Sequence, residues 1–396
     1  MKCVLHIGTE KTGTTAIQNW LYSNYAQLST QRIALSKFLQ KKNNRDLCAF
    51  FQSSFDSFFI DNGIKNIEEK NKFFLGFLDN FSEEISKLSI DHDCMVISSE
   101  HFHSQLNNVD GIAALHEFLL KNFDDVKVIC YFREQSDLRK SLYSTALRRG
   151  FSGPLVEFMP NAGVNSIYYN YLLMLSQWSD VFGIDNIEAV LYDKKHWYDG
   201  DIYKDFIKRV FDDVDLNKLN YSAERSNEGI SKLQSIFIRA INKCFDFNNS
   251  QQIYIGTDLV TNVINNKSLV LGNLTDNRAL NFYQQFDVVN KQFFEKFFGQ
   301  AKNLFQAPVS SEEQKKLFSP NTENAIVEGI CSILNRIKMM GILLSTAEAN
   351  QLKDIALKYE TNEFLSKDEA LVLMKLAQKV KSKDAIINLK IAEWEK

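Results

Sequence analysis

A loop near the start of the chain has the composition of a phosphate-binding site. It reads Gly-Thr-Glu-Lys-Thr-Gly-Thr-Thr, and Gly8 and Gly13 can both adopt the left-handed backbone of a sharp turn. Lys11 adds a point charge, while Thr14 and Thr15 offer hydroxyl groups and can cap a helix. We therefore expect this loop to hold an anion; the alternative is an ordinary connection with a solvated lysine.

The residues on either side support the anion-binding interpretation. Residues 3–7 form a short apolar run that predicts a buried strand. Ala16, Ile17, Trp20 and Leu21 then recur at helical spacing. Where a strand leads through such a loop into a helix, backbone N–H groups and the positive end of the helix dipole point at the ligand.

The order of residues differs from that of the common nucleotide-binding P-loop. In that motif the lysine follows the second glycine, as in G-x-x-x-x-G-K-[ST]. Here Lys11 precedes Gly13. The loop therefore argues against an ordinary ATPase or GTPase.

A second anion-binding pair follows a later strand. Residues 126–132 are an apolar run, Arg133 follows it directly, and Ser141 lies on the next predicted helix. A guanidinium at a strand end and a serine early in a helix can converge on one phosphate. The alternative is a solvated arginine paired with Glu134 or Asp137.

Two more polar residues lie at predicted strand ends. Glu100 closely follows a strand-like run that begins at Cys94, and Tyr192 ends another run that begins at Ile187. Ligands in parallel sheets bind beyond the carboxyl ends of the strands. We therefore expect these two residues and Arg133 to surround the phosphate loop.

Short buried strands alternate with helices as far as Gly229. This pattern predicts an α/β fold, a P-loop-like three-layer sandwich with a central, mostly parallel sheet and helices on both faces. Pro308 and Pro320 bracket a polar stretch that we interpret as a boundary. We expect an α/β domain with helical insertions over residues 1–307 and an all-helical C-terminal extension over residues 321–396.

Aromatic-rich patterns over residues 71–88 and 282–305 each predict one continuous helix. The C-terminal extension carries helical patterns over residues 323–340, 346–359 and 367–380. They offer a surface for contacts between copies of the chain or with another partner. The alternative is a helical layer that only covers the core.

Composition limits the partners and the compartment. The net charge of -3 gives no overall attraction to nucleic acid or anionic membranes. The 6 cysteines lack paired spacing, which predicts buried reduced thiols and a cytoplasmic protein. No run approaches about 18 apolar residues, so we expect no membrane span. His101 and His103 have no supporting cysteine or carboxylate cluster, so we expect no metal site.

The two anion-binding patterns together resemble the sulfotransferases that use 3′-phosphoadenosine 5′-phosphosulfate (PAPS), closest to bacterial members. Residues 11–15 are similar to the 5′-phosphosulfate loop of that family, and Arg133 with Ser141 resembles its 3′-phosphate motif. Glu10 stands where many members have proline. The resemblance covers residues 1 to about 245.

The resemblance implies a nucleotide site. Tyr192 resembles a tyrosine near the adenine, although a buried edge tyrosine would look the same. Arg225 and Asn227 resemble a late segment that closes over the nucleotide, with an N-cap role for Asn227 as an equal alternative. The 3′-phosphate distinguishes PAPS and its product PAP from ATP, and the residues implied to bind it are Arg133 and Ser141. The residues implied to bind the 5′-phosphosulfate are Lys11, Thr12, Gly13, Thr14 and Thr15.

The resemblance also implies a reaction that needs no metal. Lys11 would stabilise charge on the leaving oxygen or the sulfonate. A base must remove the acceptor proton, and Glu100 is the first candidate, with His101 and His103 behind it. A solvated side chain or a helix cap is the alternative for Glu100. The expected acceptor is a hydroxyl or amine of a carbohydrate or glycolipid. A P-loop-type nucleotide kinase or NTPase and a catalytically silent nucleotide-binding scaffold stay as alternatives.

Overall fold

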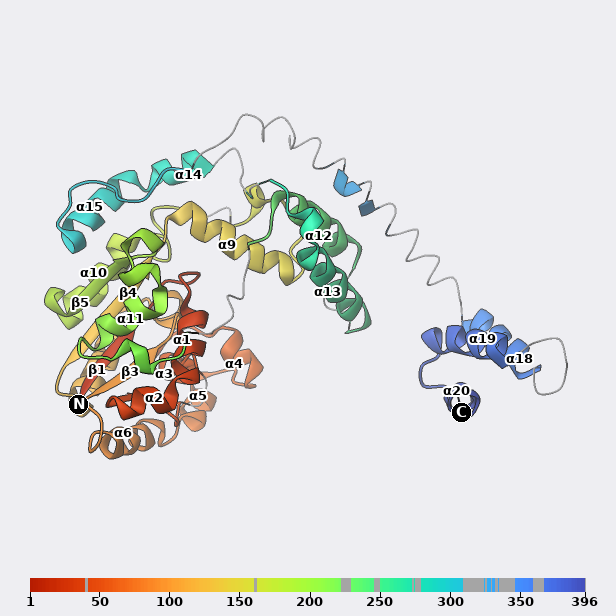
Figure 1. Ribbon diagram of the computed structural model, residues 1–396, viewed down its shortest axis with the longest axis horizontal. Coiled ribbons are helices and arrows are strands. Elements are labelled where there is room, and N and C mark those ends of the chain that lie inside the picture. Colours follow the sequence, from red (N-terminus) through yellow and green to blue (C-terminus); the bar gives the residue numbers. More distant parts are fainter. Residues whose placement is uncertain are drawn as a thin grey trace. The chain divides into compact units, whose positions relative to one another are not determined.

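The computed structural model describes most of the chain, in two compact units (Figure 1). Unit 1 holds the sheet and comprises Met1–Ala146, Gly153–Ile230 and Asn273–Lys315, and the remaining segments form unit 2. The predicted boundary between residues 308 and 320 falls almost wholly outside the described residues, so the domain division stays a prediction. The described residues are 1–39, 42–159, 162–221, 229–245, 250–272, 274, 279–308, 346–358 and 367–395, with separate residues between 324 and 334.

The core of unit 1 is a five-stranded parallel sheet with the strand order β2-β3-β1-β4-β5. In the central strand β1, Leu5 pairs with Ile97 of β3 on one side and with Val128 of β4 on the other. The strands are β1 (Lys2–His6), β2 (Ile33–Leu35), β3 (Cys94–Ser98), β4 (Val126–Phe132) and β5 (Ile187–Leu191).

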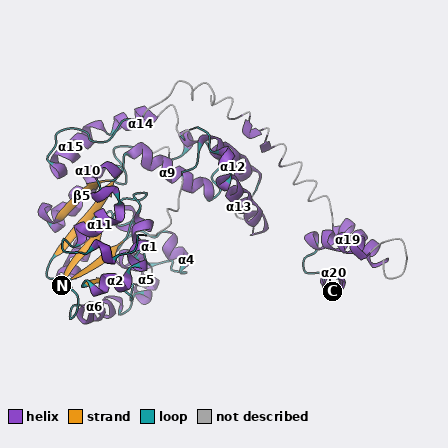
Figure 2. Ribbon diagram, viewed as in Figure 1, coloured by secondary structure: helices purple, strands orange, loops and turns teal. Residues whose placement is uncertain are grey.

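Helices cover both faces of this sheet, because successive strand residues point to opposite sides (Figure 2). In β1, Cys3 and Leu5 pack into one apolar core and Val4 packs into the other. The predicted α/β sandwich is therefore confirmed. The Val4 side is covered by α1 (Thr14–Ser23), α2 (Tyr25–Thr30) and α11 (Ile202–Val210), and the Leu5 side by α3 (Arg45–Phe51), α6 (Phe77–Leu88), α8 (Val109–Asn122), α10 (Tyr171–Phe182) and α15 (Asp287–Phe298).

Both long aromatic helices predicted from the sequence are wrong in extent, because each is interrupted. The first divides into α5 (Ile67–Phe73) and α6, with Gly76 in the left-handed conformation at φ 72° before α6. The second divides into α14 (Ala279–Gln285) and α15, which ends at Gly299 with φ 66°. Left-handed glycines delimit α6 and the end of α15 without disturbing the apolar spacing that periodicity detects, whereas the break between α14 and α15 falls at Phe286.

The remaining helices of unit 1 are α4 (Ser57–Asp61), α7 (His101–Ser104) and most of α9 (Gln135–Arg148). In unit 2, α20 was not predicted from its sequence; it begins where the Asp384 side chain accepts hydrogen bonds from Ile386 and Ile387 N–H. The predicted helix over residues 323–340 lies mostly outside the described residues. The described helices of unit 2 are α12 (Lys232–Cys244), α13 (Ser250–Asn265), α18 (Thr346–Leu357), α19 (Lys367–Val380) and α20 (Ala385–Trp394).

All six cysteines are buried. Within the described part of the chain, no helix has both the length and the apolar character needed to cross a membrane.

His6 gives the fold a pH-dependent stability. Its ring is fully buried, with Nδ1 2.9 Å from Ser98 Oγ, and burial lowers the pKa of His6 to about 3. Below about pH 6.5 the unfolded side chain takes up a proton that the folded one does not. The free energy of unfolding should therefore fall as the pH drops from about 6.5 towards 3, by at most about 1.4 kcal/mol per pH unit for this group.

Urea unfolding at pH 7 and pH 5 measures this effect. The variant His6→Gln, which has no titrating group, should lose less stability between the two pH values than the wild type does. Burial also lowers the pKa of His101 and His103, so the variant retains part of the pH dependence. An identical loss in both proteins would contradict the role of His6.

Candidate active site

The loop between β1 and α1 is tightly bent and tied to the end of β4. Lys11 and Gly13 both have left-handed backbone, with φ 65° and 77°. Thr12 is fully buried, and its hydroxyl donates to the carbonyl of Thr9 at 2.6 Å. The hydroxyl of Thr9 in turn donates to the carbonyl of Tyr131 in β4 at 2.8 Å. These bonds hold the loop at the carboxyl edge of the sheet.

The N-terminus of α1 is open to an anion. Gly13 is the N-cap residue, and no side chain caps the helix, so the capping role expected of Thr14 or Thr15 is wrong. Thr14 is buried and Thr15 is exposed. First-turn N–H groups have no partner inside their own helix, so those of α1 suit an anion.

Gly8 is required where the loop leaves β1. A Cβ atom at this position would lie 2.6 Å from Cγ2 of Thr14 and 2.7 Å from Nε2 of His6. Such distances are far shorter than van der Waals contact. Glycine therefore lets the loop pass close to the start of α1 and the buried histidine.

Arg133 and Tyr192 reach the same loop from the next two strands. The Nη1 atom of Arg133 donates to the carbonyl of Lys11 at 3.3 Å. The guanidinium carbon lies 5.9 Å from the centroid of the Tyr192 ring. A Cβ atom at Gly13 would lie 3.3 Å from Cε2 and from the hydroxyl of Tyr192. The structure therefore brings the ends of β1, β4 and β5 together, as the sequence predicted.

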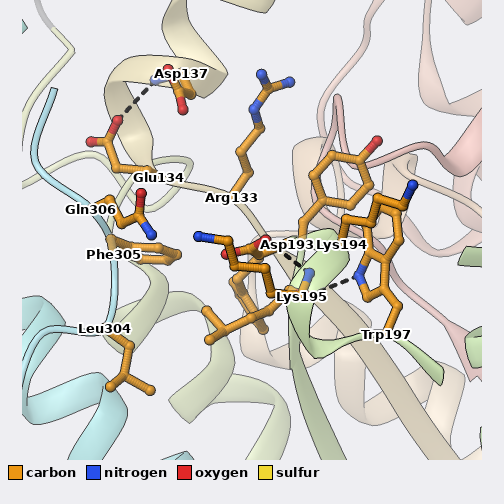
Figure 3. Close-up of a pocket in the computed structure, with 13 residues that line it drawn as sticks. Arg133, Glu134, Asp137, Asp193, Lys194, Lys195, Trp197, Leu304, Phe305 and Gln306 are labelled. Carbon is orange, nitrogen blue, oxygen red and sulfur yellow. Dashed lines mark hydrogen bonds between the residues drawn. The ribbon is translucent and has the colours of Figure 1, made fainter. Parts of the chain in front are cut away.

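A pocket of about 380 Å³ opens beside Arg133 and Tyr192 (Figure 3). In this view the side chain of Lys195 points towards Phe305 and Gln306. The volume lies in the range of small-molecule sites. The sequence analysis did not identify Lys194, Lys195 or residues 304–306 as part of a site. The two consecutive lysines directly after β5 could have indicated an anion-binding site, whereas residues 304–306 have no recognisable pattern. Side chains that complete the pocket include Lys194, Lys195, Trp197, Phe305 and Gln306.

The acidic residues of this pocket have other partners. Glu134 accepts hydrogen bonds from the backbone N–H of Ser136 at 2.8 Å and of Asp137 at 3.0 Å. Asp137 forms an ion pair with Lys140. No described carboxylate forms an ion pair with Arg133, so the alternative of pairing with Glu134 or Asp137 is not what the structure shows.

All the predicted nucleotide contacts stay predictions, and three of the predicted residues are not brought to the loop by the described structure. Ser141 lies half-buried on α9, and its carbonyl accepts a hydrogen bond from the Thr145 hydroxyl at 3.3 Å. No hydrogen bond among the described residues joins its own hydroxyl to Arg133 or to the loop. Arg225 and Asn227 lie outside the described residues.

Glu100 lies on the opposite side of the loop, at the end of β3. The side-chain amide of Gln18, on α1, donates to Glu100 Oε2 at 2.8 Å and also lies 3.3 Å from both oxygens of Ser98. Gln18 is 3% exposed, whereas the Glu100 side chain is 17% exposed. The carboxylate is thus held against the helix that begins at the phosphate loop, yet it reaches solvent. Nothing in the sequence pattern had linked these two residues.

The two candidate histidines flank Glu100 on the short helix α7. Nε2 of His101 lies 4.0 Å from Glu100 Oε1. His103 is buried, and its Nε2 lies 3.0 Å from the carbonyl of Tyr168. Burial lowers the pKa of both histidines, which favours the neutral imidazole near neutral pH. His103 is the least accessible of the three candidate bases.

The strand order explains the division of the site. Because β1 lies between β3 and β4, its loop is central, with Glu100 on the β3 side and Arg133 on the β4 side. One edge of the sheet can therefore hold an anionic group at its middle, a base on one side and a second cation on the other. Among the described residues, no group of three or more histidine, cysteine, aspartate or glutamate side chains is placed to hold a metal ion.

Comparison with known proteins does not establish what this protein does. No family model matches the chain. The chain is 26% identical over 257 residues to an uncharacterized protein of Archaeoglobus fulgidus, across 63% of this chain and 67% of that one. A solved sulfotransferase from Alicyclobacillus acidocaldarius aligns with 48% of this chain and 72% of its own, at 12% identity and a TM-score of 0.26. A similarity this low carries no argument about the reaction, so the function must be argued from the site.

Proposed function

We propose that this protein is a sulfotransferase that moves the sulfonate group of PAPS to a hydroxyl or amine, with a carbohydrate or glycolipid as the acceptor. The observation that carries the proposal is the hydrogen bond from Arg133 to the carbonyl of Lys11, across 122 residues of sequence. It places a strand-end guanidinium directly beside a loop suited to phosphate. A nucleotide with phosphates at both its 3′ and 5′ positions needs two such neighbouring sites.

In this proposal the nucleotide is held on the β4 side of the loop. Backbone N–H groups at the start of α1, with the hydroxyls of Thr14 and Thr15, bind the 5′-phosphate. Arg133 binds the 3′-phosphate through its fork of N–H donors. The adjoining pocket supplies aromatic side chains for the adenine and the cations Lys194 and Lys195.

Transfer then requires charge stabilisation and a base. The acceptor oxygen or nitrogen forms a bond to sulfur, and the bond from sulfur to the bridging phosphate oxygen breaks. Lys11 stabilises the negative charge that develops on that oxygen. Glu100 takes the proton that the acceptor loses. The electron pair of the broken sulfur–oxygen bond stays on the phosphate oxygen, and PAP leaves. The hydrogen bond from Gln18 keeps the carboxylate in place for this step.

Isothermal calorimetry with PAP and ATP tests the proposal. PAP should bind at least about tenfold more tightly than ATP, which corresponds to about 1.4 kcal/mol, and should bind equally with and without Mg²⁺. Tighter, Mg²⁺-dependent binding of ATP would contradict the proposal and favour a nucleotide kinase or NTPase. Binding of PAP without transfer to any acceptor in a broad panel would instead favour the silent scaffold.

A further inference from the structure

Two carboxylates near the phosphate loop, Glu10 and Glu100, have no lysine or arginine partner among the described residues. Glu10, within the loop, accepts a hydrogen bond from the hydroxyl of Tyr168 at 2.7 Å. Glu100 accepts one from the amide of Gln18 at 2.8 Å. Among the described residues, neither carboxylate forms an ion pair with a lysine or arginine. Two acidic side chains without a lysine or arginine partner among the described residues therefore lie near the site proposed for transfer.

A chain of contacts connects Glu10 with the segment that carries Glu100. The centroids of the Tyr168 and His103 rings lie 4.6 Å apart. The backbone carbonyl of Tyr168 lies 3.0 Å from His103 Nε2. His103 belongs to the helix α7, and Glu100 directly precedes that helix. The two carboxylates thus flank α7, one attached through Tyr168 and the other at its N-terminus.

The same segment concentrates buried polar atoms without hydrogen-bond partners among the described residues. The His103 side chain is 2% exposed, yet its Nδ1 atom has no such partner. Buried polar groups are almost always hydrogen-bonded to protein or to ordered water, so this local cluster marks a place where water or a polar ligand supplies the missing partners. The atoms are Ser99 Oγ, His101 Nδ1, His103 Nδ1 and Ser104 Oγ.

The other charged or titratable groups near these carboxylates are Lys11, Arg45, His101 and His103. Arg45 forms an ion pair with Asp56 at 2.7 Å, so part of its charge is already compensated. Burial lowers the pKa of His101 and of His103, which leaves both rings mostly neutral near pH 7. The phosphosulfate group that Lys11 is proposed to bind adds further negative charge. An anionic acceptor would be repelled on this side, whereas a cationic one would be attracted.

Resting on the proposed function, we infer that the acceptor is cationic, and that Glu10 binds its protonated amine while Glu100 faces the neighbouring group that accepts the sulfonate. The hydroxyl of Tyr168 holds the Glu10 carboxylate in position for it. Amino sugars are the carbohydrate class that presents an amine beside hydroxyl groups.

Ligand titration of the PAP-loaded protein, followed by NMR, tests this inference. The probes are glucosamine, glucose and glucuronate, which share one ring and differ in charge. Glucosamine should bind at least tenfold more tightly than either of the others. In Glu10→Gln, whose amide oxygen still accepts a hydrogen bond from Tyr168, this preference should shrink to about twofold or less. PAP is kept saturating throughout, so that changes in nucleotide affinity do not enter.

The matched control is Glu117→Gln, which removes one carboxylate from an exposed position on α8 and should leave the preference for glucosamine unchanged. Equal affinity for all three sugars, no binding of glucosamine, or a full preference in Glu10→Gln would each overturn the inference. A wild-type protein that does not bind PAP in the first place would refute the proposed function instead. The two failures are therefore distinguishable.

Discussion

Replacing Glu100 by glutamine should lower kcat for sulfonyl transfer by about 10²- to 10⁴-fold, the usual contribution of a general base. Glutamine keeps an oxygen that accepts the hydrogen bond from Gln18, so the fold and the position of the side chain are preserved. It cannot accept the acceptor proton. The measurement is PAP formation from PAPS with an acceptor that the wild type uses.

Nucleotide affinity separates the catalytic effect from a structural one. Glu100 lies on the β3 side of the loop and Arg133 on the β4 side, so Glu100→Gln should bind PAP with nearly wild-type affinity. Unchanged turnover would exclude Glu100 as the base. A loss of turnover in His101→Gln alone would transfer that role to the neighbouring histidine.

Replacing Arg133 by alanine should weaken PAP binding by about 30- to 100-fold, or about 2–3 kcal/mol, as expected for a lost hydrogen bond to a charged group. ADP lacks the 3′-phosphate, so its affinity should fall by less than about threefold. That smaller loss reflects the hydrogen bond that Arg133 also donates to the carbonyl of Lys11. Calorimetry with both nucleotides measures the two effects.

The variant Arg133→Lys is the control for charge without fork geometry. It should lie between the wild type and Arg133→Ala for PAP, because lysine provides a point charge but not paired donors. Equal losses for PAP and ADP in Arg133→Ala would assign the arginine to the loop structure alone. Ser141 would then be the remaining candidate ligand of the 3′-phosphate within the described residues.

The sheet and the edge that carries the site could be predicted from the sequence because both depend on local patterns. The strand β4 is an apolar run with Arg133 directly after it, and parallel strands place such ends together. The phosphate-binding loop can likewise be predicted from the residue types and spacing of Gly8, Lys11 and Gly13 alone. These inferences need no knowledge of which side chains meet.

The contacts that orient the side chains could not be predicted. Gln18 and Glu100 are 82 residues apart, and Glu10 and Tyr168 are 158 residues apart. Gln18 meets Glu100 because α1 packs against the sheet. Glu10 meets Tyr168 because the chain returns to the loop just before α10. The sequence does not indicate which residue a buried glutamine on an amphipathic helix will contact. The pocket residue Phe305 is unpredictable for the same reason, since it follows α15 by a short irregular segment.

A crystal structure of the protein with bound PAP tests the central claim most directly. We expect the 5′-phosphate within hydrogen-bond distance of the backbone N–H groups at the start of α1, and the 3′-phosphate within hydrogen-bond distance of the Arg133 guanidinium. One nucleotide would then join the ends of β1 and β4. A PAP molecule bound elsewhere, or bound at the loop with its 3′-phosphate directed away from Arg133, would contradict the account.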